Sequence, residues 1–170
     1  DRLYYYSNKS MPRNVNRLYY DCTNFFAEKE LEDCDVKGKS EDWYQDHTLR
    51  KYGKSKENRP NPIVQMGMFM DGNGIPLAFD ITSGNTNEQI TLKPLEKKII
   101  NDFNTSEFVV CTDAGLASMA NRKFNNTKQR KFITTQSIKK LKAHLKAEAL
   151  DLTKGWHLPN ETKTYNISKL

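Results

Sequence analysis

Two aspartates stand in segments that otherwise have the composition of buried β-strands. Asp21 lies inside the aromatic and β-branched run 18–26, and Asp113 follows the apolar run 108–112. Asp is depleted in strands, and a buried carboxylate needs a partner, so an inward-facing Asp in a strand usually holds a metal ion or a proton. We therefore predict that Asp21 and Asp113 face each other on neighbouring strands.

Clustered carboxylates repel one another, and a divalent cation relieves that repulsion. Mg²⁺ or Mn²⁺ suits such a site, because these ions bind through few carboxylates and keep positions open for water and phosphate. A pair of such ions activates a water or a 3′-hydroxyl and stabilises the leaving oxygen of an in-line displacement. Asp113 precedes the turn Ala114-Gly115, at the carboxyl end of its strand, where sites form in open α/β sheets. The pattern favours phosphodiester chemistry.

A structural role remains open for each residue type. Asp21 is also suited to pair with Arg17, and Asp113 to cap the helix expected after Gly115. Glu148 and Asp151 are weaker candidates for a third carboxylate. The histidines have no partner at ligand spacing, and the strand cysteines have the character of small core residues; these are His47, His144, His157, Cys22 and Cys111.

The composition is that of a polar globular domain with a basic surface. The 170 residues carry a net charge of +6, and the mean hydropathy is −0.82. A basic surface favours a polyanionic partner, nucleic acid first. Three cysteines without C-x-x-C spacing fit a reducing cytoplasm rather than a disulfide framework. No apolar run reaches the ~18 residues of a membrane helix, and no signal peptide is visible.

Two basic segments are candidates for contact with DNA phosphates. The first follows an acidic stretch over 27–46 that we interpret as a solvated loop or short helix. Gly53-Lys54-Ser55 matches the end of a phosphate-binding loop, but Thr48 replaces its first glycine and Pro60 follows where a helix must begin. We therefore expect a flexible loop that grips a DNA backbone or is merely solvated. The candidate DNA-binding residues are Arg50, Lys51, Lys54, Lys56 and Arg59 in the loop, and Lys139, Lys140, Lys142 and Lys146 on a later helix.

The order of elements predicts an α/β fold with a mixed central sheet and helices on both faces. Residues 63–70 and 75–81 form a β-hairpin about the turn Asp71-Gly72-Asn73-Gly74. A helix capped by Asn87 or Thr91 follows, with Pro94 in its first turn. Then come the strand of Asp113, a short helix over 118–125 and a strand over 131–135. The last helix is capped by Ser137, and one face carries Ile138, Leu141, Leu145 and Ala149.

Five motifs occur in an order that is more specific than any one of them. They are Leu18-Tyr19-Tyr20-Asp21-Cys22-Thr23-Asn24-Phe25, Tyr52-Gly53-Lys54-Ser55-Lys56-Glu57-Asn58-Arg59-Pro60, Gly72-Asn73-Gly74-Ile75-Pro76-Leu77-Ala78, Gly84-Asn85-Thr86-Asn87-Glu88 and Val109-Val110-Cys111-Thr112-Asp113-Ala114-Gly115. Together they resemble the catalytic domain of bacterial insertion-sequence transposases of the DDE type.

The resemblance implies a ribonuclease-H-like catalytic core over 18–150, preceded by the tail of an upstream region over 1–17. It implies two Mg²⁺ (or Mn²⁺) ions held by Asp21, Asp113 and a Glu. It further implies 3′-end hydrolysis and strand transfer on double-stranded DNA, with the transposon terminal repeats and the target as DNA partners. The enzyme would act as a homodimer and would be nucleoid-associated in the bacterial cytoplasm. Residues 151–170 match the start of a β-rich insertion, so the Glu is expected beyond Leu170 and the chain alone is expected to be inactive.

Two other functions remain open on the sequence. One is a ribonuclease-H-like nuclease or resolvase that cuts DNA without strand transfer. The other is a DNA-binding or assembly module whose catalytic machinery has decayed. A strand-transfer assay separates the first from a transposase, and a Glu-bearing helix downstream of Leu170 argues against the second.

Overall fold

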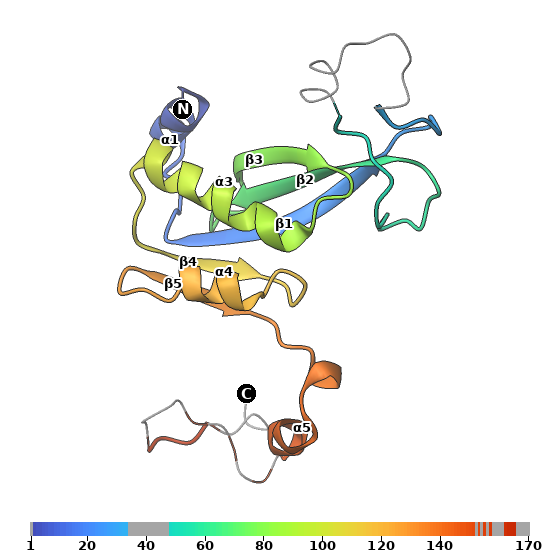
Figure 1. Ribbon diagram of the computed structural model, residues 1–170. Helices are drawn as coiled ribbons and strands as arrows, with labels where there is room; N and C mark the ends of the chain where they lie inside the picture. Colours follow the sequence, from blue (N-terminus) through green and yellow to red (C-terminus); the bar gives the residue numbers. More distant parts are fainter. Residues whose placement is uncertain are drawn as a thin grey trace. The chain divides into compact units, whose positions relative to one another are not determined.

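The computed structural model describes residues 2–33, 48–151, 153, 155, 157 and 162–165 (Figure 1). The chain forms two compact units, Asp1–Thr135 and Gln136–Leu170. Most of the acidic stretch, together with Cys34 and His47, lies outside the described residues. Among the residues that are described, no helix is long and apolar enough to cross a membrane.

The first unit is built on a mixed five-stranded sheet, which confirms the predicted α/β class. The strand order is β3-β2-β1-β4-β5; β1 and β3 pair antiparallel to β2, while β4 lies parallel to both β1 and β5. The elements are α1 (Arg2–Ser10), β1 (Arg17–Phe26), β2 (Ile63–Met70), β3 (Pro76–Ser83), α3 (Glu88–Phe103), β4 (Phe108–Thr112), α4 (Met119–Phe124) and β5 (Arg130–Thr134).

Local sequence signals place most of these elements. Gly74 has φ of 78°, a left-handed conformation that favours glycine, in the predicted turn between β2 and β3. Asn87 caps α3 by accepting a hydrogen bond from Gln89 N, and Ser118 caps α4 in the same way through Asn121 N. Pro94 differs from the prediction, because α3 begins at Glu88 and therefore holds Pro94 inside the helix rather than in its first turn.

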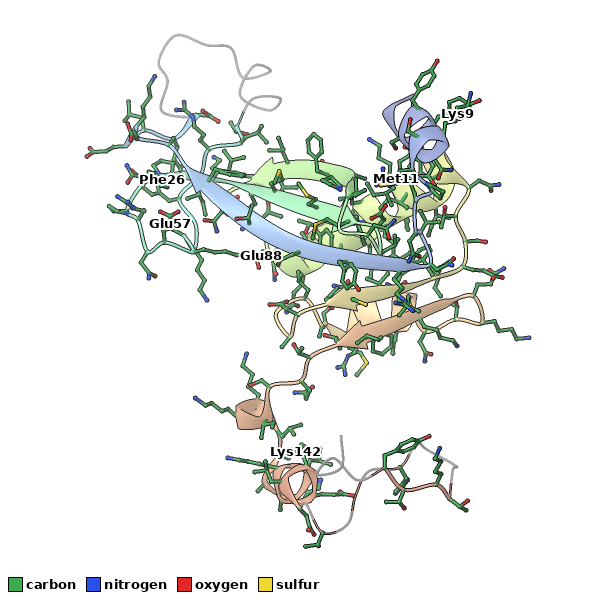
Figure 2. All side chains as sticks on the ribbon, turned by 180° about the vertical axis from the view of Figure 1, so that it is seen from behind. Lys9, Met11, Phe26, Glu57, Glu88 and Lys142 are labelled. Atoms are coloured by element: carbon green, nitrogen blue, oxygen red, sulfur yellow. The ribbon has the colours of Figure 1, made fainter. Side chains whose placement is uncertain are left out.

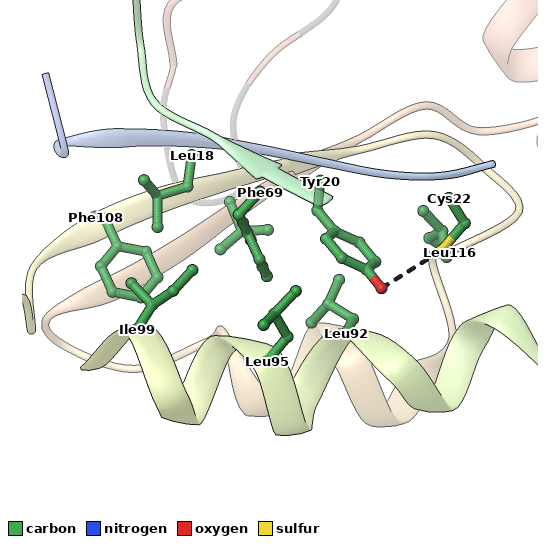
Figure 3. Packing of buried hydrophobic residues seen from close by; sticks show 10 residues of the cluster. Leu18, Tyr20, Cys22, Phe69, Leu92, Leu95, Ile99, Phe108 and Leu116 are labelled. Atoms are coloured by element: carbon green, nitrogen blue, oxygen red, sulfur yellow. Dashed lines mark hydrogen bonds between the residues drawn. The ribbon is translucent and has the colours of Figure 1, made fainter. Parts of the chain in front are cut away.

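The core lies between the sheet and α3. Alternate residues of β1 are buried, and Leu18, Tyr20 and Cys22 point to the helix, as the two-residue period of a strand requires. Figure 3 shows these side chains packed with Phe69 of β2 against one side of α3. That side consists of Leu92, Leu95 and Ile99, whose three- and four-residue spacing is that of one face of a helix.

Helices cover one face of the sheet in the described part of this unit, whereas the sequence predicted helices on both. Asn121 of α4 donates a hydrogen bond to Gln89 O, and Asn125, which follows α4, donates one to Glu96. Helix α4 therefore lies beside α3 on the same side (Figure 1). The opposite face, here called the open face, is lined by partly exposed apolar side chains: Tyr19, Phe25, Met66, Met68, Met70, Phe79, Ile81 and Ile133. The period of two at which Met66, Met68 and Met70 recur favours core packing, but their strand parity places them on the open face.

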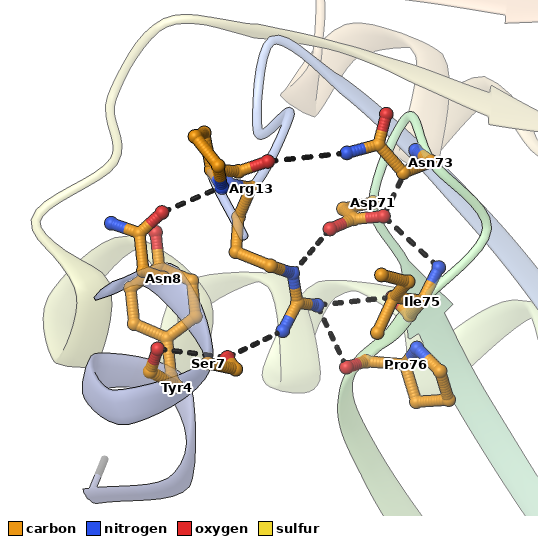
Figure 4. Close-up of polar contacts among 9 residues, drawn as sticks. Tyr4, Ser7, Asn8, Arg13, Asp71, Asn73, Ile75 and Pro76 are labelled. Atoms are coloured by element: carbon orange, nitrogen blue, oxygen red, sulfur yellow. Dashed lines mark hydrogen bonds and ion pairs between the residues drawn. The ribbon is translucent and has the colours of Figure 1, made fainter. Parts of the chain in front are cut away.

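The N-terminal segment forms a helix that the sequence analysis did not predict. The ring of Tyr4 in α1 lies 4.4 Å from the ring of Phe103 at the end of α3. Arg13 then forms a buried ion pair with Asp71 and donates to the carbonyl oxygens of Ile75 and Pro76 (Figure 4). This arginine ties the segment to the turn between β2 and β3.

The second unit contains α5 (Ala143–Leu150), preceded by a 3₁₀ turn at Ile138–Lys140. The sequence predicted one continuous helix from Ser137. Instead, Leu141 has extended backbone and Ser137 makes no side-chain cap. No residue of α5 is buried, so the packing that usually stabilises a short helix is missing at this break.

Candidate active site

The pairing of β1 with β4 brings Asp21 and Asp113 to corresponding positions. Tyr19 pairs with Cys111 in this parallel ladder, and each aspartate stands two residues further along its chain. Both aspartates line one surface hollow, with Asp21 in the middle of β1 and Asp113 directly after the end of β4. Tyr19 and Thr135 line it as well, and neither was predicted. Tyr19 shares the strand parity of Asp21, which is the signal that would have identified it.

Asp21 and Asp113 are exposed, which corrects the expectation of an inward-facing Asp21. The inward positions of β1 go to Leu18, Tyr20 and Cys22, and the intervening Asp21 consequently faces the open side of the sheet. Its position gives the carboxylate direct access to solvent and to a substrate.

Each carboxylate is oriented by one backbone N–H. Asp21 Oδ1 accepts a hydrogen bond from Cys22 N at 2.8 Å, and Asp113 Oδ1 accepts one from Leu116 N at 3.1 Å. Within the described ranges, no ion pair joins Asp21 to Arg17, and no hydrogen bond occupies the Oδ2 atom of either aspartate. The structural roles considered for the two residues therefore leave one oxygen of each available.

Free carboxylate oxygens on neighbouring strands are a donor set that hard divalent cations accept. Asp21 and Asp113 therefore fit the predicted Mg²⁺ or Mn²⁺ site. The described residues contain no group of three or more His, Cys, Asp or Glu side chains placed to hold a metal ion. A third acid beyond Leu170 stays a prediction.

Three cations of the first basic segment are engaged with carboxylates. Arg50 donates its backbone N–H and its Nε to the buried Asp33, and Lys51 Nζ lies 3.8 Å from Glu32. Burial favours the neutral acid, but the hydrogen bonds from Arg50 outweigh it and hold the pKa of Asp33 below its usual value. Arg59 pairs with Glu57 and stacks over the Phe26 ring at 4.8 Å. These contacts give the segment a structural role besides any DNA contact.

The remaining part of the segment is fixed against β1 rather than flexible. Asn24 donates to Lys54 O and accepts from Lys56 N, while Ser55 Oγ accepts from the backbone of Glu57 and Arg59. Figure 2 shows this loop, with Glu57 labelled, beside the Phe26 end of β1. The Lys56 ammonium contacts Cys22 O, the carbonyl next to Asp21. Positive charge is thus held at the backbone of the residue that follows Asp21.

Gly84 anchors the base of this loop, because Gly84 N donates to Leu49 O and its Cα lies against the backbone of two neighbours. A Cβ at this position would lie 2.0 Å from Ile63 O and 2.6 Å from Lys51 O. We expect Gly84→Ala to lower the free energy of unfolding by about 1–3 kcal/mol, as overpacking does. Urea denaturation measures this change. Gly74→Ala is the comparison, because a Cβ at Gly74 meets no atom within 4 Å and only the positive φ is unfavourable there. An unchanged midpoint for Gly84→Ala would contradict the close approach.

Lys139, Lys140, Lys142 and Lys146 are exposed in the second unit. Lys142 precedes α5, and its backbone carbonyl accepts from Lys146 N. Their proposed contact with DNA remains a prediction.

Comparison with known proteins finds similarity in fold only, to solved structures. No protein-family model matches the sequence, and no curated protein matches it significantly. Two solved structures resemble it. The first is the Mos1 transposase paired-end complex with the left transposon end, with TM-score 0.43 and 12% identity over 77% of this chain. The second, the Mos1 mariner paired-end complex with Mn, has TM-score 0.42 and 13% identity over the same share. The match spans 38% and 39% of those chains, and likenesses this weak carry no functional conclusion.

Proposed function

We propose that this chain is part of the catalytic core of a DNA transposase of the DDE type, with a ribonuclease-H-like arrangement of its sheet. The observation that carries the proposal is that Asp21 of β1 and Asp113, which directly follows β4, line one surface hollow. Each stands two residues after the paired residues Tyr19 and Cys111. The ordered motifs of the sequence support it, since both aspartates fall within motifs that resemble that family. The basic loop beside β1 supports a nucleic-acid substrate.

In this proposal Asp21 and Asp113 hold Mg²⁺ or Mn²⁺ through their free oxygens. The bound ions supply activation of a water or 3′-hydroxyl and charge stabilisation at phosphorus. The backbone N–H groups of Cys22 and Leu116 keep the two carboxylates oriented before any ion binds. A Glu beyond Leu170 completes the ligand set, and the partners are the transposon terminal repeats and target DNA, bound by a homodimer.

The carboxylate pair can be tested by metal binding alone. We expect Asp21→Asn and Asp113→Asn each to weaken Mn²⁺ binding to the chain by about tenfold or more. Even the loss of a residue that only hydrogen-bonds to a metal ligand lowers metal affinity by about 10–100-fold. Electron paramagnetic resonance of free Mn²⁺ measures the loss. Asp102→Asn, at an exposed position of α3, is the matched control. Equal affinity in all four proteins would contradict the proposed site.

Strand transfer distinguishes the transposase from a nuclease. The full-length protein is assayed with Mn²⁺ and a labelled terminal repeat joined to target DNA. Joined product that disappears in Asp21→Asn and Asp113→Asn supports the proposal. Cleavage without joining would favour the nuclease or resolvase, and the absence of both with normal DNA binding would favour the decayed module.

A further inference from the structure

A second pocket lies in the first unit, between the basic loop over 50–59 and the start of α3. It has a volume of about 330 Å³, close to the lower limit of the ~300–1,000 Å³ typical of small-molecule pockets. Four segments form it: the basic loop, β2, the residues that begin α3, and the turn after Asp113. Its lining includes Lys54, Lys56, Gln65, Glu88, Gln89 and Gly115.

One side of this pocket is cationic. Lys54 and Lys56 line it, and the loop that carries them is held to β1 through Asn24. In the described part of the chain, no ion pair or hydrogen bond involves the Lys54 ammonium, and the Lys56 ammonium contacts only the carbonyl of Cys22. Two lysines with no carboxylate partner are positioned for a phosphate.

The other side presents unused hydrogen-bond acceptors. Gln65 is 5% exposed and lines the pocket, yet its Oε1 has no partner among the described residues. Its Nε2 lies 3.5 Å from Gly84 O, which orients the amide. A buried acceptor without a donor is costly, so Gln65 Oε1 favours a ligand that brings an N–H or O–H. The Glu88 carboxylate on the same wall also favours a donor and disfavours phosphate there.

One residue that lines the pocket belongs to the turn that follows Asp113. Gly115 lines it, and a Cβ built on Gly115 would lie 3.3 Å from both carboxylate oxygens of Asp113. Gln89 Nε2 donates to Gly115 O at 3.0 Å and fixes this turn against α3. A group bound in the pocket can therefore contact the turn that follows Asp113.

We propose that this pocket takes one unpaired nucleotide of a DNA strand, with its phosphate at Lys54 and Lys56 and a donor group of its base at Gln65 Oε1. The volume suits one nucleotide, and the acceptors require a base edge that is not engaged in a base pair. The proposal deepens the proposed function, on which it rests for the choice of DNA. It adds a nucleotide-binding residue, Gln65, that carries no charge and belongs to none of the basic segments.

The test compares a labelled blunt duplex with the same duplex carrying a two-nucleotide single-stranded tail of either polarity. Fluorescence anisotropy is measured in EDTA, so that metal binding does not contribute. We expect tailed DNA to bind roughly fivefold to tenfold more tightly, the effect of one or two added hydrogen bonds. Equal binding of blunt and both tailed duplexes would overturn the proposal.

Variants assign the preference to the pocket. Gln65→Met keeps the side-chain volume and removes the acceptor, so we expect it to abolish the preference while leaving blunt-duplex affinity unchanged. Lys54→Ala with Lys56→Ala weakens both duplexes and also removes the preference. Lys128→Ala, an exposed lysine before β5, is the charge control and should retain it. A preference retained in Gln65→Met would overturn the assignment.

Crosslinking of the unaltered protein provides a second readout if Gln65→Met fails to fold. A tail that ends in 4-thiothymidine is irradiated and the attached peptide is identified by mass spectrometry. Attachment within 54–56, 86–89 or at 65 or 115 supports the pocket, and attachment elsewhere overturns it. Asp21→Asn should retain the preference for tailed DNA. Failure of the nucleotide pocket and failure of the metal site are therefore distinguishable.

Discussion

Replacing Asp71 with Ala should lower the free energy of unfolding by about 3–5 kcal/mol, because it leaves a buried guanidinium without its counter-charge. The side chains of Arg13 and Asp71 are 3% and 0% exposed. Asp71 also accepts hydrogen bonds from the backbone of Asn73 and Ile75 (Figure 4). The loss therefore includes both the ion pair and the organisation of the turn.

Urea denaturation at pH 7 measures this effect, with Asp102→Ala as an exposed control. The double variant Arg13→Met with Asp71→Leu removes both charges, and we expect it to recover part of the loss. A decrease below about 1 kcal/mol in Asp71→Ala would show that water reaches the arginine.

The ion pair also has a defined pH dependence. Burial alone would raise the pKa of Asp71, but the Arg13 guanidinium and the two backbone N–H groups hold it below its usual value. The stabilisation is therefore fully present above the unfolded-state pKa near 3.9 and is lost as pH falls through the lower folded-state value.

Glu96 should produce the opposite pH dependence. Its carboxyl is fully buried, and burial raises its pKa to about 7 even though Asn125 donates a hydrogen bond to Oε2 at 2.8 Å. Arg130 Nε lies 3.8 Å from Oε1, too far for a hydrogen bond. The folded state keeps a proton that the unfolded state releases near 4.5. Stability therefore decreases as pH rises from about 4.5 to about 7, by on the order of 3 kcal/mol in total.

The difference between the wild type and Glu96→Gln isolates this contribution. Both proteins are denatured in urea at intervals between pH 4.5 and 8.5. The contribution of histidine titration is the same in both proteins and cancels in the difference. We expect the wild type to lose stability relative to the variant up to about pH 7 and the difference to level off above it. Parallel curves would show that Glu96 is not protonated in the folded protein at neutral pH.

Short-range patterns made a large part of this fold predictable. The glycines after Asp71 predicted the hairpin, and Asn87 was one of the two residues predicted to cap α3. Each of these depends on residues that are close in sequence, or on a period that holds along a strand. The same two-residue period also indicates that Asp21 points to the face opposite to Leu18 and Tyr20.

The rest depended on partners that are distant in sequence. Arg13 stands in a polar segment, and no local pattern indicates that its counter-charge is Asp71. Glu96 is different, because it lies one turn after Leu92 on the buried side of α3 and periodicity alone would have indicated its burial. The pocket acceptor Gln65 has no local signal, since an inward glutamine in β2 acquires meaning only when α3 and the basic loop close over it.

The ladder between β1 and β4 has a consequence for how the protein folds. It contains only three registered residue pairs. The two strands are distant in sequence, because β2, β3 and α3 all lie between them in the chain. A hairpin such as β2–β3 forms in about 1–10 μs, whereas pairing across so long an intervening chain is entropically slow. The two aspartates therefore meet late, and an unfolded or half-folded chain has no site. A cation bound between them would select the fully folded molecule and slow its unfolding.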